Sequence, residues 1–68
     1  MAASFPASLS EANDRFANSG LLGYVPENEH YAFADYWYRG DEDTSMAEAV
    51  IAYMGDRLDD ADRRAIRE

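Results

Sequence analysis

The first pattern of apolar and polar positions predicts a helix between Ser8 and Gly20. Ser8 and Glu11 form a capping-box pair: the serine hydroxyl accepts from the glutamate N–H, and the carboxylate reaches back to the serine N–H. Apolar residues then recur at helical spacing, at Leu9, Ala12 and Phe16. Gly20 lies where a left-handed residue often ends a helix, so we expect the helix to stop just before it.

The segment of residues 26–40 carries signals for both a helix and a strand. Pro26 suits a first helical turn, and Glu29 suits the positive end of a helix. The segment is also rich in rings that are compatible with a strand, at Tyr31, Phe33, Tyr36, Trp37 and Tyr38. Strand alternation fails, because Asp35 interrupts the odd positions and His30 begins the even ones. We therefore predict a helix, with a strand as the alternative.

The third segment gives the clearest helix signal. Ser45 and Glu48 form a second capping-box pair. A continuous apolar stripe follows, at Met46, Ala49, Val50, Tyr53 and Met54. Gly55 comes directly after this stripe, and we expect it to end the helix, so that the helix covers about residues 46–54.

A short terminal helix follows, capped by Asp59 or Asp60 and holding one strong apolar residue, Ile66. Three to four short helices predict a small all-α bundle, with an α+β fold as the alternative if residues 26–40 form a strand. A chain of 68 residues allows a single domain. We expect residues 1–7 and the last turn to be frayed, since termini are ordered only where they are tied down.

Charge changes this picture more than any other property of the composition. The chain has 14 Asp and Glu against 6 Lys and Arg, a formal net charge of −8. Because 47% of its residues are hydrophobic, we interpret it as folded rather than disordered. It has no cysteine and no apolar run of the roughly 20 residues that cross a bilayer. We do not expect its first residues to act as a secretory leader, since they lack a basic stretch followed by an apolar one. We expect a cytoplasmic protein that binds no membrane. If a phage encodes the protein, we expect it in the cytoplasm of the bacterial host.

The side chains offer little for catalysis. His30 is the one histidine, lysine and cysteine are absent, and no Gly-x-Ser-x-Gly turn exists. A lone histidine with scattered carboxylates does not predict a zinc site. The acidic stretch that begins at Asp41 lacks the EF-hand pattern, since its sixth and twelfth residues are Met46 and Ala52. We therefore expect no catalytic residues, no metal site and no cofactor, and we interpret the protein as a non-enzyme.

Direct binding of nucleic acid is not expected either. A phosphate-binding surface needs a net cationic stripe, and the arginines near the C-terminus lie among acidic residues. For these we predict ion pairs at i,i+4 spacing, Asp59–Arg63 and Asp60–Arg64, on a solvated helix.

Two features are candidates for binding a partner. Acidic residues gather on both sides of the third helix: Asp41, Glu42 and Asp43 before it, and Asp56, Asp59, Asp60 and Asp62 after it. Carboxylates at such spacing can imitate consecutive phosphates, although acidic residues also cap helices and keep small proteins soluble. The second feature is a surplus of rings, with Tyr36, Trp37 and Tyr38 as candidate anchors. The alternative for the rings is that they cover the edge of a thin core.

The aromatic stretch that leads into Gly40, the acidic triplet and Ser45 is similar to a segment of ArdA-type antirestriction proteins, which are acidic mimics of duplex DNA that inhibit restriction enzymes. The similarity covers residues 33–48, about a quarter of the chain, with a one-residue insertion before Gly40. It implies that Asp41, Glu42 and Asp43 mimic phosphates, and that Phe33 and Trp37 are structural. In size, acidity and lack of cysteine, the chain also resembles phage anti-CRISPR proteins.

These observations predict an inhibitor, encoded by a phage or mobile element, that occupies the basic nucleic-acid-binding groove of a defence enzyme. The acidic residues would pair with arginine and lysine, and one of the three candidate rings would anchor the complex. The alternative is a small helical adaptor or regulator that binds through the aromatic patch and forms a homodimer. In that case the acidity serves solubility alone.

Overall fold

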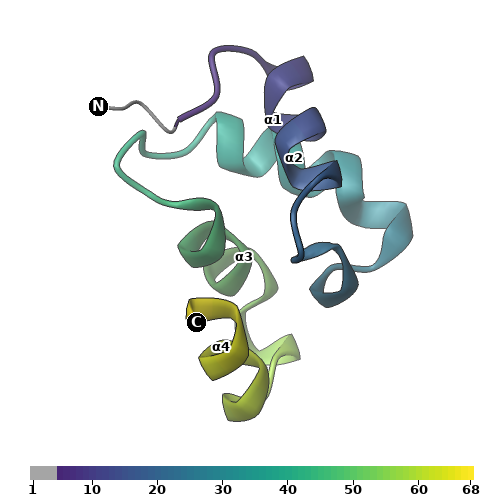
Figure 1. Ribbon diagram of the computed structural model, residues 1–68, viewed down its shortest axis with the longest axis vertical. Coiled ribbons are helices and arrows are strands. Elements are labelled where there is room, and N and C mark those ends of the chain that lie inside the picture. The colour runs from purple at the N-terminus through teal and green to yellow at the C-terminus, as the bar shows by residue number, and fades with distance from the viewer. Residues whose placement is uncertain (1–4) are drawn as a thin grey trace.

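The computed structural model describes residues 5–68 and shows an all-α protein (Figure 1). Four α-helices run over Leu9–Ala17 (α1), His30–Tyr38 (α2), Met46–Met54 (α3) and Asp60–Arg67 (α4). Three short 3-10 helices lie at Leu22–Tyr24, Glu27–Glu29 and Gly55–Arg57. The described part contains no strand, so the all-α prediction is confirmed and the strand alternative for residues 26–40 is wrong.

Consecutive helices pack on one another. α1 packs along α2, α2 contacts α3, and α3 packs on α4. In Figure 1, α1 and α2 fill one end of the molecule and α4 lies at the other, with the loop between α2 and α3 projecting from one side. The molecule extends over 30 × 27 × 19 Å. The α2–α3 loop is thus an outer edge of the fold rather than a buried connection.

Three helices begin as their caps predict. The side chains of Ser8, Ser45 and Asp59 accept the backbone N–H three residues on, at 3.1, 3.2 and 2.8 Å. The second predicted bond of each capping box, from the glutamate carboxylate back to the serine N–H, is replaced by an ion pair. The carboxylate of Glu11 pairs with Arg15, and that of Glu48 pairs with Arg67. An arginine satisfies these carboxylates by charge, which a neutral backbone N–H cannot do.

The segment of residues 26–40 forms helix rather than strand over residues 27–38, and one narrow face of α2 is buried. Phe33, Ala34 and Trp37 lie at i, i+1 and i+4 and are almost fully buried, whereas Tyr31 and Tyr36 are 63% and 45% exposed. A strand would have placed Phe33 and Ala34 on opposite faces. The first turn of this segment is the 3-10 helix Glu27–Glu29, directly after Pro26.

Of the two helix ends predicted at glycines, the one at Gly55 is confirmed and the one at Gly20 is wrong. Gly55 follows α3 with φ of 57° and ψ of −129°, a conformation open to glycine and strained for other residues, so the predicted stop is confirmed. The left-handed cap predicted at Gly20 is wrong, because Gly55 is the one glycine of residues 5–68 with positive φ. α1 ends earlier, at Ala17, where the side-chain amide of Asn18 donates to the Asp14 carbonyl at 2.9 Å.

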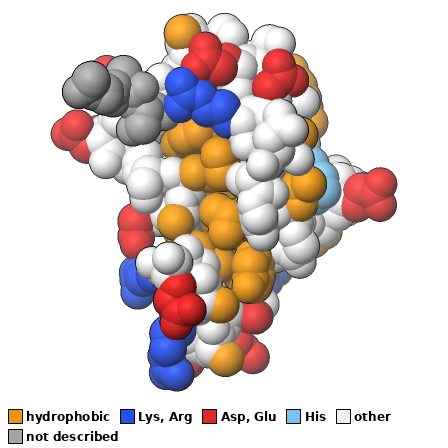
Figure 2. Space-filling view, viewed as in Figure 1, with side chains coloured by type: hydrophobic (Ala, Val, Ile, Leu, Met, Phe, Trp, Pro, Cys, Tyr) orange, Lys and Arg blue, Asp and Glu red, His pale blue; other side chains and the backbone are white. Residues whose placement is uncertain are grey.

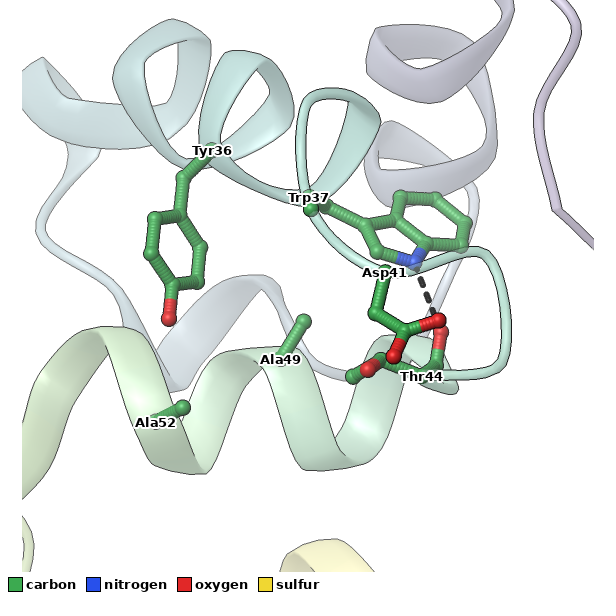
Figure 3. Close-up of a pocket in the computed structure, with 7 residues that line it drawn as sticks. Tyr36, Trp37, Asp41, Thr44, Ala49 and Ala52 are labelled. Atoms are coloured by element: carbon green, nitrogen blue, oxygen red, sulfur yellow. Dashed lines mark hydrogen bonds between the residues drawn. The ribbon is translucent and has the colours of Figure 1, made fainter.

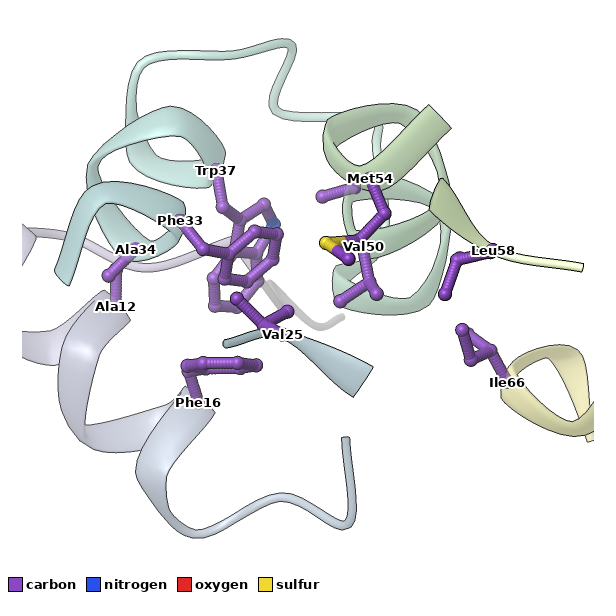
Figure 4. Close-up of a cluster of buried hydrophobic side chains, with 11 residues drawn as sticks. Ala12, Phe16, Val25, Phe33, Ala34, Trp37, Val50, Met54, Leu58 and Ile66 are labelled. Carbon is purple, nitrogen blue, oxygen red and sulfur yellow. The ribbon is translucent and has the colours of Figure 1, made fainter. Parts of the chain in front are cut away.

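A single apolar core runs through the molecule (Figure 4). Ala12, Phe16, Phe33 and Ala34 gather at the α1–α2 side, Val50, Met54, Leu58 and Ile66 gather at the α3–α4 side, and Val25 lies between them. The rings of Phe16 and Phe33 have centroids 4.6 Å apart. Burial of a side chain of this kind contributes about 1.5–3 kcal/mol, so this core is the main source of stability.

Both ends of the described chain have contacts that oppose fraying. Phe5 packs edge-on against Trp37, with ring centroids 6.2 Å apart. α4 stays helical to Arg67, where Ile66 is buried and the Arg67 guanidinium donates twice to the Glu48 carboxylate, at 2.9 and 3.2 Å. Residues 1–4 of the predicted frayed N-terminus lie outside the described residues. The fraying of residues 5–7 and of the last turn stays a prediction.

Candidate partner-binding surface

The acidic loop, by which we mean Asp41, Glu42 and Asp43, is exposed to solvent between α2 and α3. The Asp41 carboxylate accepts the backbone N–H of Asp43 at 2.9 Å, and the Asp41 carbonyl accepts the N–H of Thr44 at 2.9 Å. These two bonds form a tight turn of the kind that aspartate favours. The turn holds three neighbouring carboxylates on one outer edge of the molecule.

The acidic loop is a cluster of negative charges without ion pairs, because the arginines pair with carboxylates elsewhere in the described part. Within the described part, five arginines pair with five carboxylates: Arg15 with Glu11, Arg39 with Asp35, Arg57 with Glu29, Arg63 with Asp60 and Arg67 with Glu48. Of the 14 acidic residues, these pairs leave nine without an arginine. Three of the nine are the consecutive residues of the acidic loop.

The C-terminal acidic cluster (Asp56, Asp59, Asp60 and Asp62) is less available than the sequence indicates. Asp59 caps α4, and Asp60 pairs with Arg63 at 3.0 Å. The predicted pairs Asp59–Arg63 and Asp60–Arg64 are therefore replaced by one i,i+3 pair, because the capping role turns the Asp59 carboxylate toward the backbone. Residues 56–68 also contain four arginines, so the net charge of this segment is close to zero.

The two acidic groups precede and follow α3 along the chain. α3 covers nine residues, or about 13 Å at 1.5 Å per residue. Asp56 and Asp62 are the members of the C-terminal cluster that remain without an ion pair or capping bond in the described part. The acidic loop is consequently the stronger of the two candidates.

Among the predicted aromatic anchors, the structure favours Tyr36. Trp37 is only 3% exposed, and its indole Nε1 donates to the Thr44 carbonyl at 3.2 Å, so little of this side chain is open to a partner; its role as an anchor stays a prediction. This burial agrees with the structural role that the antirestriction resemblance implies. Tyr38 is half-buried against the core. Tyr31, at 63% exposure, is the most open ring and was not among the predicted anchors.

A pocket of about 160 Å³ connects the exposed ring to the acidic loop (Figure 3). Its walls come from the end of α2 and the loop, and its floor comes from α3: Tyr36, Trp37, Gly40, Asp41, Thr44, Ala49 and Ala52. Figure 3 shows the Tyr36 ring on one side, the Asp41 carboxylate and the indole on the other, and the two alanine methyl groups below. Small residues at 49 and 52 leave the space open.

A second polar cluster was missed by sequence reasoning. The Glu29 carboxylate accepts from the Tyr53 hydroxyl at 2.9 Å and from the Arg57 guanidinium at 2.9 and 3.1 Å. These bonds lower the pKa of Glu29, the Arg57 bonds most. Burial, and then the Glu29 carboxylate, raise the pKa of Tyr53. Tyr53 and Arg57 lie 24 and 28 residues after Glu29 in the chain, so no local sequence pattern indicates these contacts.

Figure 2 shows how the charges are distributed over one face. Hydrophobic side chains form a band down the middle of this face, and most acidic and basic side chains lie around its margins. Partly buried residues that cover the core supply such apolar surface, among them Leu21, Leu22, Met46, Ala47 and Ile51. The acidic loop lies at an edge of the molecule (Figure 1), and its Asp41 shares the pocket with aromatic and apolar residues.

The chain matches none of the family models, curated proteins or solved structures with which it was compared. Residues 5–68 contain no group of three or more histidine or acidic side chains placed to hold a metal ion. None of the helices in this range is both long and apolar enough to span a bilayer. The acidic loop, the pocket and Tyr36 are the features of the described residues that indicate a binding partner.

Proposed function

We propose that the protein is a small acidic inhibitor, encoded by a phage or mobile element, that binds the basic nucleic-acid-binding surface of a defence enzyme. The observation that carries this proposal is the acidic loop: three consecutive, exposed carboxylates without an ion pair in the described part of the chain. Acidity that served solubility alone would not need this local concentration. The antirestriction resemblance of residues 33–48 supports the choice of a defence enzyme.

Inhibition would follow from competition for cationic side chains. Arginine and lysine residues that hold phosphates also bind carboxylates, and arginine does so with two parallel hydrogen bonds. A net charge of −8 on a body 30 Å long attracts a basic groove and raises the rate of encounter. Exposed charges are screened beyond about 8 Å at physiological ionic strength, so the affinity should fall as salt is added.

The test is displacement of a labelled DNA duplex from a purified restriction enzyme or CRISPR surveillance complex. The variant D41N/E42Q/D43N removes the charge of the acidic loop and is expected to weaken displacement strongly, because each lost contact to an arginine costs about 1.5–3 kcal/mol when water is excluded. Displacement by the wild-type chain should also weaken between low and moderate salt.

A matched control separates the loop from the total charge. D14N/E27Q/E68Q removes three exposed carboxylates that lie elsewhere and have no ion pair in the described part. This variant is expected to displace DNA almost as well as the wild-type chain. Equal losses in the two triple variants would contradict a role specific to the loop. Displacement that is indifferent to salt would contradict charge mimicry altogether.

One observation favours the second candidate function, an adaptor that binds a partner protein or its own copy through aromatic surface. Tyr31 and Tyr36 stand out of α2 at 63% and 45% exposure, and tyrosine is typical of interface hot spots. Light scattering of the isolated chain against Y31S/Y36S tests this candidate. A dimer that the double variant abolishes, together with full activity of D41N/E42Q/D43N, would favour the adaptor.

A further inference from the structure

The pocket beside the acidic loop has the size of a site for one side chain. Ligand sites for cofactors and drug-sized molecules usually enclose about 300–1,000 Å³. The pocket here is partly open to solvent and has a volume of about 160 Å³. Its lining is mostly apolar, from Trp37 and the two alanines, with the Asp41 carboxylate as its one charged group. A long side chain with an apolar stem and a positive end fits both properties.

We propose that this pocket binds a single arginine side chain of the basic partner. The aliphatic stem lies over the indole of Trp37 and the methyl group of Ala52, and the guanidinium meets the Asp41 carboxylate. The choice of a partner arginine as the occupant rests on the proposed function. The pocket itself can be tested without that partner.

The polar groups of the pocket are arranged for a cation. The indole Nε1 is already used by the Thr44 carbonyl, so Trp37 presents an apolar ring rather than a donor. One oxygen of Asp41 accepts the Asp43 N–H, and the other has no partner among residues 5–68. An anionic ligand would meet this carboxylate with repulsion. A neutral ligand would leave the carboxylate unpaired.

The ring of Tyr36 favours arginine over lysine. It forms one wall of the pocket and is held by the Tyr53 ring, with centroids 5.4 Å apart. A planar guanidinium stacks on an aromatic face and keeps its edge donors for a carboxylate, whereas an ammonium is a compact and strongly hydrated charge. An aromatic wall beside a carboxylate therefore matches arginine in shape as well as in charge.

The experiment is an NMR titration of the full chain at low salt with acetyl-argininamide, acetyl-lysinamide and acetyl-norleucinamide. We expect a saturable shift of the Trp37 indole N–H and of the Gly40 amide with the arginine probe, and smaller shifts with the other two. Equal shifts with the lysine probe would overturn the choice of arginine. Equal shifts with the norleucine probe would overturn the role of charge.

Two matched pairs of variants locate the binding. A52M fills the pocket from an exposed helical position and should abolish the shift, while A65M makes the same change on exposed α4 and should not. D41N should weaken binding about threefold, the effect of one exposed ion pair, while E42Q removes an equal charge outside the lining and should change binding little. Equal effects within either pair would overturn the pocket as the site.

The same variants distinguish failure of this inference from failure of the proposed function. If arginine binds in the pocket but the chain displaces no DNA, the inhibitor proposal is wrong and the pocket stands. If the chain displaces DNA and A52M does so equally well, the inhibitor proposal stands and the pocket is not its contact.

Discussion

Among residues 5–68, Glu29 is the residue on which the largest number of long-range polar contacts converge. Its carboxylate binds both Tyr53 at the end of α3 and Arg57 just after it, although Glu29 itself precedes α2. The Arg57 guanidinium also lies 5.7 Å from the centre of the Tyr53 ring, within the range of a cation–π contact. One carboxylate thus joins the start of one helix to the end of the next.

Glu29 should make stability depend on pH on the acid side. Because its pKa is lowered below 4.5 in the folded chain, its contribution is present above pH 4.5 and is lost as the pH falls through the lowered value. We expect the stability difference between the wild-type chain and E29Q to be largest near neutral pH and to shrink on acidification. Urea unfolding at a series of pH values measures this difference.

Glu27 provides the control, since it is exposed and has no ion pair in the described part. The difference between the wild-type chain and E27Q should be small at every pH. A gap for E29Q that stays constant down to low pH would contradict the role of its ion pair.

At the scale of the helix, the sequence predicted the features that depend only on residues close together in the chain. Ser8, Ser45 and Asp59 cap their helices because an N-cap needs only the next three residues. Helical spacing places Trp37 on the same face as Phe33, but it does not determine that this face, rather than the face of Tyr36, is buried. Which face is buried depends on how α2 lies against Phe5 and α3, which is a tertiary property. The Glu29 cluster and the pocket follow from the same packing.

Gly55 makes the stop of α3 testable. A Cβ added there meets no atom within 4 Å, so replacement by alanine acts through the backbone alone, at φ of 57°. We expect G55A to lower the free energy of unfolding by about 1–3 kcal/mol. Thermal or urea unfolding measures the change.

Gly23 is a matched control, because a Cβ there is equally unobstructed and its φ is not positive. G23A should be neutral, or should stabilise by about 0.4–1 kcal/mol through the unfolded chain. Equal losses in G55A and G23A would show that the conformation of Gly55 is not what limits the substitution.

At the scale of the whole molecule, repulsion between distant carboxylates should outweigh the five ion pairs, most of which are partly exposed. The Debye length is about 30 Å at 0.01 M salt and about 10 Å at 0.1 M. At 0.01 M salt, charges therefore interact across the full 30 Å of the molecule. We expect the melting temperature to rise between these two salt concentrations, measured by circular dichroism.

The variant D14N/E27Q/E68Q should melt higher than the wild-type chain at 0.01 M salt and should respond less to added salt. A wild-type melting temperature that falls as salt is added would mean that the ion pairs, and not the excess charge, dominate.

Trp37 is the sole tryptophan of the chain, and its indole forms part of both the core and the pocket wall. Its fluorescence emission is therefore an intrinsic signal for two events at once. Unfolding would shift the emission to the red, while a guest arriving beside the ring would change its intensity with the fold intact. Docking to a target can thus be followed in real time without attaching a dye.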